Sequence, residues 1–502
     1  MLNGSYTGSM LEVSNTLGSN AEDITMGYYA ASAGMAIAYP IVPKVLGAVS
    51  SKVLLLADLT LQFLLSWFCA RSQSADTLIV CSFFIGFLKG FLMLWCIRRI
   101  KTIFSPKDVR SEFYAYFYPL VFGCGQLSMI ITAELAYHYD WKYMYYFMMI
   151  LLLAALLMVA ICFRHDRPLR RIPLRELHVR EMFVASAGLL MLMYVLCYGK
   201  VLDWLSSPRI CLYVVLGPAL LVFFLRTQHR SRNPYVDLAP LRQPKALVGY
   251  LYMMIVMFFS TSTTLLTNYM TSILQVDATH SYTLYVWLLP GYALGAFVCF
   301  WWFRWQRWRF RFLIAGGMAC FALFFGLLYF GISPGSTYQS LFFPVFVRGA
   351  GMLTLIIAFA LFAVEELNPK YLICNAFFLI ACRSVLAPVM AASFYGNALY
   401  RLQQKYLCSL SEHFTLTDPA AAAKYAAALD SSLARGHGYA EAAQLATGEL
   451  YSTLQQQSLL LALKDILGWL FAVSLLLAVV SRFIPFHKTI RVRYAKAGDD
   501  MV

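Results

Sequence analysis

Charged residues are scarce in this chain. Only 13% of its 502 residues are Asp, Glu, Lys or Arg, whereas 60% are hydrophobic. Soluble domains carry about 25% charged residues, so this composition excludes a large soluble core. It indicates an all-α protein of the polytopic membrane class, because the apolar runs are long enough to cross a bilayer as helices.

Acidic residues are fewer than basic ones, 25 against 40, which leaves a net charge of +15. A nucleic-acid-binding surface would gather the basic residues on one face or along one helix. Here they recur in short clusters between apolar runs. We therefore interpret them as markers of membrane topology, and we expect no nucleic-acid partner.

Motifs for metal binding, ATP hydrolysis and acid–base catalysis are missing. The 12 cysteines form no C-x-x-C pair and no Cys/His ligand spacing, so we expect neither a metal site nor a disulfide framework. There is no G-x-x-x-x-G-K-[ST] phosphate loop, no H-E-x-x-H and no G-x-S-x-G. We expect no enzyme activity and no cofactor, and any pumping must draw on an ion gradient.

The stretch 164–181 sets the orientation of the chain. It holds six arginines and two prolines between two apolar runs. A short basic loop beside membrane spans stays in the cytoplasm, so the other spans can be counted outward from it. The apolar runs predict thirteen spans, at residues 24–43, 53–70, 77–97, 113–137, 143–163, 182–198, 210–225, 247–274, 282–303, 312–332, 340–364, 371–396 and 458–481.

Basic residues recur in every second loop, and the C-terminal tail is basic as well. These segments are 44–52, 98–110, 164–181, 226–245, 304–311, 370 and 482–496. With the tail in the cytoplasm, an odd number of spans leaves the N-terminus outside. We therefore expect a first span that is truncated or missing, with residues 1–11 as the outer half of that helix. The alternative is a true external N-terminus.

The segment 397–457 interrupts the pattern of short loops. The span count places it outside the membrane. Its alanine-rich stretches 420–428 and 439–454 predict two helices, separated by Arg435-Gly-His-Gly. Two interpretations stay open: a docking hairpin for a periplasmic partner, or a solvated cap on the outer mouth.

Ionisable residues inside the spans are the best site candidates in a single sequence. Each costs at least about 2.5–3.5 kcal/mol at a helix centre unless it is paired or hydrated. The candidates for a proton or substrate pathway are Glu134, Lys89, Arg348, Arg383 and Asp58, with Asp465 near the start of the last span.

The predicted roles of three of these residues differ. Glu134 is our first choice for a carboxyl that binds and releases a proton as access alternates; the alternative is a glutamate wetted at the outer interface. Lys89 is central in its helix, and we expect it to face a cavity or to pair with Glu134 or Asp58. For Asp58 we favour a structural pairing with Lys52 on the same helix.

Two arginines lie deep in predicted spans. Arg348 in R-G-A-G-M and Arg383 in C-R-S-V-L-A-P are each followed by small residues that allow close helix packing. Arginine at this depth needs carbonyl groups, a carboxylate or water. We slightly favour a packing role for both over contact with substrate. Tyr28, Tyr29 and Trp287 are candidates to line an apolar pocket.

Four stretches carry a family resemblance. Residues 2–18, from Leu2-Asn3-Gly4-Ser5 to Leu17-Gly18, resemble an L-D-x-T…L-G first helix. Residues 199–204 resemble the G-x-x-x-x-W end of an extra span, and residues 233–238 resemble the segment after the next span. Arg348-Gly-Ala-Gly-Met and Asn375…Arg383 resemble R-G-x-G-M and N…R-Q-x-G. Together with the long external loop, these stretches resemble the major facilitator superfamily, and within it the fourteen-span drug:proton antiporters.

This resemblance implies the major facilitator fold, with two six-helix bundles and two additional spans. The first bundle would cover residues 1–163 with an incomplete first helix, followed by the cytoplasmic loop 164–181 and the additional spans in 182–245. The second would cover 246–396, then the external segment 397–457, and end with the last span and tail in 458–502. Substrate would bind near the midplane between the bundles.

The resemblance also implies a function and partners. They are proton-driven efflux of apolar or amphipathic compounds across the cell inner membrane, with a periplasmic adaptor and an outer-membrane channel. The chain departs from the family pattern at Asn3, which replaces the first-helix aspartate, and at Lys89, which replaces the glutamine of R-x-x-Q-G. Asn3 therefore joins the pathway candidates. The alternatives are a transporter of a specific metabolite or siderophore, or a transport-inactive scaffold for the adaptor.

Overall fold

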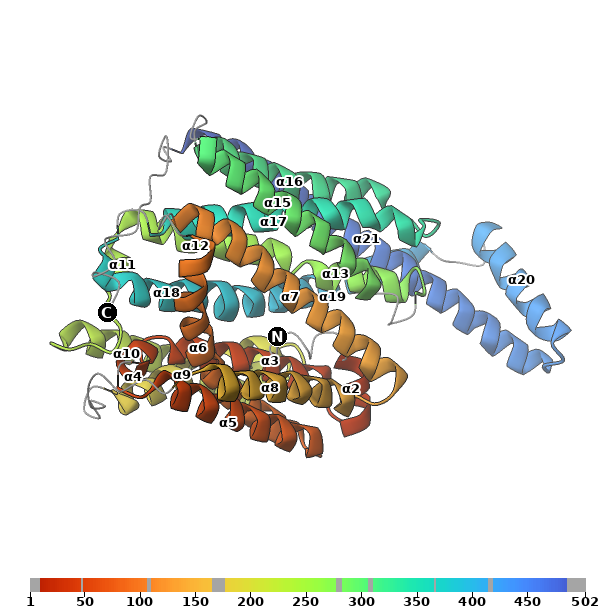
Figure 1. Cartoon of the computed structure of the whole chain (residues 1–502). Helices are drawn as coiled ribbons and strands as arrows, with labels where there is room; N and C mark the ends of the chain where they lie inside the picture. Colours follow the sequence, from red (N-terminus) through yellow and green to blue (C-terminus); the bar gives the residue numbers. More distant parts are fainter. Residues whose placement is uncertain are drawn as a thin grey trace.

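The computed structural model describes residues 10–46, 48–105, 110–164, 177–276, 282–305, 310–364, 367–413 and 419–484. Within these ranges every regular element is a helix (Figure 1). Twelve of the described helices are long and apolar enough to cross a membrane. The expected all-α polytopic fold is confirmed.

The helices form two halves joined by a pair of additional helices (Figure 1). The first half contains α2 (Met10–Leu17), α3 (Ala21–Ala38), α4 (Val42–Leu46), α5 (Ser51–Arg71), α6 (Ala75–Phe104), α7 (Arg110–His138) and α8 (Lys142–Cys162). The additional helices are α9 (Val179–Tyr198) and α10 (Pro208–Arg230), connected through η3 (Trp204–Ser206). The second half contains α11 (Ala239–Arg242), α12 (Pro244–Ser260), α13 (Thr263–Ser272), η4 (Leu284–Trp287), α15 (Leu288–Trp305), α16 (Phe310–Gly331), η5 (Tyr338–Leu341), α17 (Phe342–Phe362), η6 (Pro369–Tyr371), α18 (Leu372–Ile380), η7 (Ala381–Leu386), α19 (Ala387–His413), α20 (Pro419–Ala434) and α21 (Tyr439–Phe483).

The first predicted span, 24–43, falls on α3, which is not among the twelve apolar helices. Twelve of the thirteen predicted spans therefore correspond to the apolar helices, and the first does not. Its sequence, AEDITMGYYAASAGMAIA, consists mostly of small residues, and most of them are buried. A helix that faces protein on most sides does not need the long apolar side chains that lipid requires.

Helix α3 packs mainly against α6, and the two backbones approach each other through glycines. A Cβ atom added at Gly34 would lie 2.1 Å from the Phe83 carbonyl oxygen. One added at Gly86 would lie 1.9 Å from the Ala31 carbonyl oxygen. Small residues allow this approach, which supports helix association where no hydrophobic effect operates between helices. Only glycine fits at these two positions of the α3–α6 seam.

The second half uses the same kind of contact between α15 and α17. A Cβ atom added at Gly291 would lie 2.4 Å from the Phe346 carbonyl oxygen, and one added at Gly295 would lie 2.7 Å from that of Ala350. The remaining pairings also correspond, since α5 packs against α8 in the first half and α16 against α21 in the second. The two halves therefore repeat one packing scheme.

The additional helices α9 and α10 pack on each other and connect the two halves. The Tyr198 hydroxyl at the end of α9 donates to the Asp23 carboxylate at the start of α3. In the connection that follows, Trp204 Nε1 donates to Asn397 Oδ1 of α19 at 3.1 Å. These two bonds connect the outer ends of both halves to the segment formed by α9, η3 and α10.

One predicted span is broken in two. The expected span 247–274 consists of α12 and α13, separated at Thr261 and Ser262. The hydroxyls of Ser260 and Thr261 donate to the carbonyls of Val256 and Met257, each at 2.8–2.9 Å. Hydroxyl side chains that bond the preceding turn compete with the regular helix and bend it.

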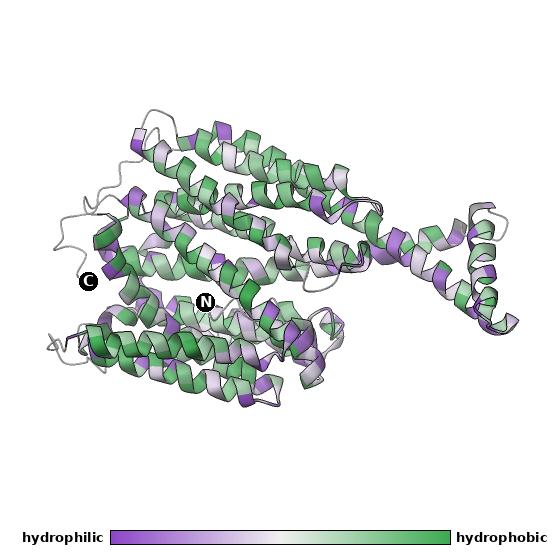
Figure 2. Cartoon of the chain, turned by 45° about the vertical axis from the view of Figure 1, so that its right-hand side comes forward, coloured by the Kyte–Doolittle hydropathy of each residue, from purple (hydrophilic) through white to green (hydrophobic). Residues whose placement is uncertain are grey.

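The last span is continuous with the external segment. Helix α21 has 45 residues and is about 67 Å long at 1.5 Å per residue, whereas a bilayer core is about 30 Å thick. Its first half therefore projects beyond the body, where α20 packs beside it as a hairpin (Figure 2). The two helices predicted at 420–428 and 439–454 are present, but the second does not end before the last span.

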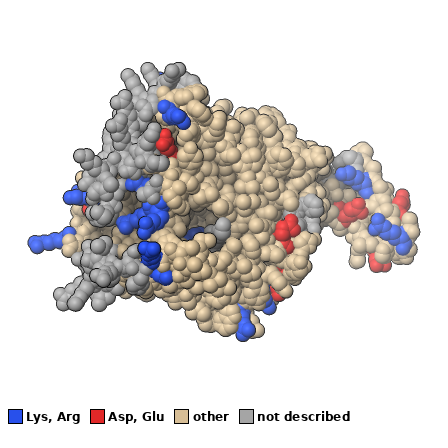
Figure 3. All heavy atoms as spheres, viewed as in Figure 1, with Lys and Arg blue, Asp and Glu red and all other residues tan. Residues whose placement is uncertain are grey.

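Basic residues mark the end opposite this hairpin. Most Lys and Arg side chains visible on the body gather there (Figure 3). Basic loops stay in the cytoplasm, so we call this end the inner end and the hairpin end the outer end.

A larger side chain in the α3–α6 seam is expected to destabilise the fold. Gly86→Val would force the two backbones apart, because its Cβ has no room beside Ala31, and overpacking costs about 1–3 kcal/mol or more. The matched control is Gly316→Val in α16, where an added Cβ meets nothing within 4 Å. Thermal unfolding in detergent should show a lower midpoint for Gly86→Val only. Equal shifts of the unfolding midpoint in both variants would contradict the tight packing between α3 and α6.

Candidate functional site

The two halves meet along two lines of contact. On one side α7 packs against α15 and α17, and on the other side α3 packs against η7. Aromatic rings fill the first line: the centroids of Phe122 and Tyr292 are 6.0 Å apart, and those of Tyr116 and Phe300 are 5.5 Å apart. The surface is hollowed between the halves (Figure 3). Residues at this interface can be exposed alternately to the two sides if the halves move.

Arg383 lies at this interface, in the π-helical turn η7. Such turns hold one extra residue and are common at functional sites. The Arg383 guanidinium carbon is 5.9 Å from the ring centroid of Tyr118 and 5.8 Å from that of Phe122, both on α7. Its Nε donates to Ser384 Oγ at 3.5 Å. The side chain of a second-half helix is thus held by aromatic rings of the first half.

Two tyrosines, one in α3 and one directly after it, complete the surroundings of Arg383. Tyr28 and Tyr39 both interact electrostatically with the guanidinium. In the described part of the chain, Arg383 makes no ion pair with a carboxylate. A guanidinium over aromatic faces is stabilised by the ring quadrupoles, by about 2 kcal/mol or more where water is excluded. The centre of the interface is therefore a cation enclosed by aromatic rings.

Arg348 lies inside the second half and not at the interface. It is 4% exposed on α17, and its guanidinium carbon is 5.7 Å from the ring centroid of Phe324. Its Nε and Nη1 have no hydrogen-bond partner among the described residues. A buried charge without partners is costly. Arg348 therefore raises the free energy of the folded state above that of an apolar side chain packed at the same position.

Three tyrosines surround Arg348, but their hydroxyls are engaged elsewhere. They are Tyr285, Tyr292 and Tyr395, which interact electrostatically with the guanidinium. Tyr285 bonds Thr267 Oγ1 at 3.1 Å, Tyr395 donates to the Phe258 carbonyl at 2.9 Å, and Tyr292 contacts Met352 Sδ at 3.8 Å. The tyrosines provide ring faces and dipoles around the cation, but no carboxylate.

Glu134 lies on α7 near its outer end. Its side chain is 41% exposed, and its Oε2 is 3.3 Å from His138 Nε2 one turn later on the same helix. The structure thus places Glu134 at the surface, beside a histidine that is itself exposed.

Asp58 lies inside the first half, on α5, at 4% exposure. Its Oδ2 accepts a hydrogen bond from Gln62 Nε2 at 3.0 Å. The expected pairing with Lys52 is wrong, because Lys52 Nζ donates to the Ala160 carbonyl on α8 at 2.7 Å. The Gln62 amide thus pairs with one carboxylate oxygen, while Oδ1 of Asp58 is buried without a hydrogen-bond partner among the described residues.

Two predicted residues remain. Lys89 is half-buried on α6, between Gly86 and Gly90, the two glycines that face α3. Asn3 lies outside the described residues. Of the five described positions, Arg383 is the one whose side chain lies beside aromatic rings of the other half.

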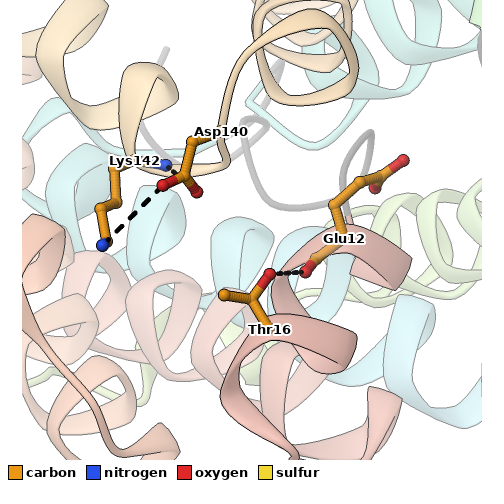
Figure 4. Close-up of polar contacts among 4 residues, drawn as sticks. All are labelled: Glu12, Thr16, Asp140 and Lys142. Carbon is orange, nitrogen blue, oxygen red and sulfur yellow. Dashed lines mark hydrogen bonds and ion pairs between the residues drawn. The ribbon is translucent and has the colours of Figure 1, made fainter.

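Glu12 is a carboxylate that the sequence reasoning missed. It lies on α2, the short helix before α3, and its Oε2 is buried without a hydrogen-bond partner among the described residues. Its carboxylate interacts electrostatically with Tyr282, which precedes η4 in the second half. Figure 4 shows the side chain directed away from the nearby Asp140–Lys142 pair, whose charged atoms are 3.8 Å apart. The signal was an acidic residue within the helical stretch that resembles a first span.

A comparison with protein families identifies one match. The sequence model of the Major Facilitator Superfamily matches residues 1–392.

Similar proteins are known as well. Multidrug export protein EmrB of Escherichia coli (strain K12) is 23% identical over 186 residues, which are 37% of this chain and 36% of that relative. The match thus spans about a third of the relative's length. A crystal structure of a mutant of the peptide transporter POT with alafosfalin has a TM-score of 0.56 at 13% identity, covering 96% of this chain and 91% of that chain. The same transporter with sulfate has a TM-score of 0.52 at 14% identity, covering 95% and 93%. At these identities the structures show the fold alone.

Replacement of Arg348 by an apolar residue is expected to stabilise the protein. In Arg348→Met the stem keeps much of its packing, while a buried charge without hydrogen-bond partners at two of its nitrogens is removed. Apolar replacements of buried charged groups are often neutral or stabilising by about 1–4 kcal/mol. The unfolding midpoint in detergent should rise. A clear fall would show that the guanidinium holds the second half together.

Proposed function

This chain belongs to the major facilitator superfamily of secondary transporters, and from that premise we propose that it exports apolar or amphipathic compounds in exchange for protons. The observation that carries the proposal is the cation of Arg383, enclosed at the contact between the halves by rings from α7 and by tyrosines in and directly after α3. Rings and one cation suit a ligand with a large apolar body and few polar groups.

Alternating access follows from the packing of the helices. Each half is held internally by its glycine seam, α3–α6 or α15–α17. The contacts between the halves consist mainly of side-chain rings. Rigid halves with a softer interface can rock about a site near the midplane. The similarity to EmrB supports the efflux direction and an inner-membrane location, and both remain part of this proposal.

The proton carrier is assigned to a carboxylate. Glu134 remains a candidate, but its side chain is 41% exposed and is paired with His138. Glu12 fits the role better, because its Oε2 is buried and without a hydrogen-bond partner among the described residues. It also interacts with Tyr282 across the two halves at their outer end. A proton taken up there when the outer side opens would be released toward the inner side after closure.

The α20–α21 hairpin is the proposed docking point for a periplasmic adaptor that leads to an outer-membrane channel. The hairpin stands clear of the body (Figure 2), and its two helices pack through small residues such as Ala428 and Ala446. Its outward faces carry exposed Leu433, Leu445 and Tyr451. Transport of a specific metabolite or siderophore is the alternative for the same fold, and a transport-inactive scaffold would use the hairpin alone.

Reconstituted protein tests the coupling. In proteoliposomes loaded with a lipophilic fluorescent dye, an imposed pH gradient should drive dye movement, and its collapse by an ionophore should stop it. Glu12→Gln should abolish the gradient-driven movement, because it keeps the shape of the side chain but cannot exchange a proton. Glu134→Gln, at an exposed position, should behave as wild type.

Each other outcome has a definite meaning. Loss in Glu134→Gln with normal Glu12→Gln would assign the proton to Glu134. Normal coupling in both variants would refute both assignments. Wild-type protein that ignores the gradient for every dye would refute proton-driven efflux and leave the scaffold or a specific substrate.

A further inference from the structure

An apolar groove lies on the second half, away from the contact between the halves. It has a volume of about 690 Å³ and runs between α12, α19 and α21. Every residue that lines it is apolar, including Leu251, Phe258, Ala398 and Leu477. The groove opens sideways, since Phe394 and Trp469 on its rim are 53% and 73% exposed. In a membrane this opening faces lipid.

The groove is longer than one leaflet of a bilayer core and shorter than the whole core. It extends from Ala387 to Leu402 along α19 and from Ile466 to Leu477 along α21, about 22 Å and about 16 Å at 1.5 Å per residue. A bilayer core is about 30 Å thick, so the groove reaches from its outer mouth past the midplane. The lining residues offer no polar group to a ligand. A hydrocarbon chain in the groove would restore the dispersion contacts that an empty groove lacks.

The outer mouth of the groove is basic. Arg401 and Lys405 on α19 flank Leu402, and both side chains are exposed. Neither of these basic side chains makes a hydrogen bond or an ion pair with another residue in the part of the chain that the structure describes. Tyr406 donates to Asp465 and so holds α19 and α21 together at this point.

At the inner end of the groove, the nearest basic residue after Leu477 on α21 is Arg482, and its guanidinium carbon lies 4.3 Å from the ring centroid of Phe312. That cation is therefore engaged within the second half. Basic residues are otherwise concentrated at the inner end of the molecule (Figure 3), so the two at the outer mouth are not explained by the rule that places positive charge in the cytoplasm.

We propose that the groove binds one acyl chain of an outer-leaflet phospholipid, whose phosphate is bound by Arg401 and Lys405. Phosphate accepts strong, charge-assisted hydrogen bonds from arginine and lysine. The lipid completes the packing among α12, α19 and α21, and so stabilises the last span against the rest of the second half. This binding does not depend on the direction or the substrate of transport.

Native mass spectrometry of the full chain, purified in mild detergent and supplied with phosphatidylglycerol, tests the site. Wild-type protein should retain one phospholipid per chain. The double variant Arg401→Gln, Lys405→Gln should weaken retention about tenfold, because each charge-assisted contact contributes a substantial part of the affinity. The charge-matched control is Lys424→Gln with Arg435→Gln in the exposed hairpin, which should retain lipid as wild type.

A second variant tests the groove itself. Ala398→Trp should fill it and expel the chain, whereas Leu476→Trp on an exposed part of α21 outside the groove should not. In nanodiscs, phospholipids brominated on the acyl chain should quench Trp469 fluorescence, measured as the difference from Trp469→Phe. Ala398→Trp and Leu476→Trp are compared by lipid retention in native mass spectrometry, because their new indoles would add to the fluorescence signal.

Three results would overturn the proposal. Lipid retention that is equal in the double variant and in its control would refute the phosphate site. Equal loss in Ala398→Trp and Leu476→Trp would show unspecific annular lipid. A shift of the monomer–dimer distribution by Ala398→Trp, with lipid retention unchanged, would make a second copy of this chain the occupant.

Discussion

The close approach of α3 and α6 at Gly34 and Gly86 is the contact on which the arrangement of the first half depends. Neighbouring helices in lipid gain little from the hydrophobic effect, so tight packing of small residues must hold them. With one face of α3 fixed against α6, its remaining surface contacts α9 and η7. That geometry presents Tyr28 and Tyr39 to Arg383. The tight packing within the first half therefore determines which tyrosines lie near Arg383 at the contact between the halves.

The additional helices change how freely the halves can separate. Tyr198 of α9 bonds Asp23 of the first half, and Trp204 bonds Asn397 of the second. Both bonds lie at the outer end, on the side where α3 meets η7. The opposite side, where α7 meets α15, has ring contacts without such a brace. Movement of the halves is therefore expected to be larger on the α7 side, with α9 and α10 acting as a partial tether.

The sequence indicated how deep each residue lies in the membrane, but not the direction in which its side chain points. Apolar runs and alternating basic loops placed nearly every span, because both follow from the cost of charge in lipid. They could not show that Glu134 faces outward or that Arg383 faces the other half, since these facts depend on rotation about each helix axis. Helix α3 was counted like the other spans, because burial between helices leaves no mark in a count of apolar residues. The role proposed for Glu12 depends on Tyr282, which is distant in sequence.

In the proposed function, the ring contacts of Arg383 would couple ligand binding to movement of the halves. Tyr118 and Phe122 belong to α7, whereas Arg383 belongs to η7, so any opening that separates these helices removes aromatic faces from a half-buried cation. The open state is then destabilised by the lost contacts. A ligand shifts this equilibrium only through its different affinity for the two states. A compound that offers its own ring to Arg383 replaces the lost faces in the open state, so binding and opening favour each other. Ligands that cannot do so would leave the halves closed.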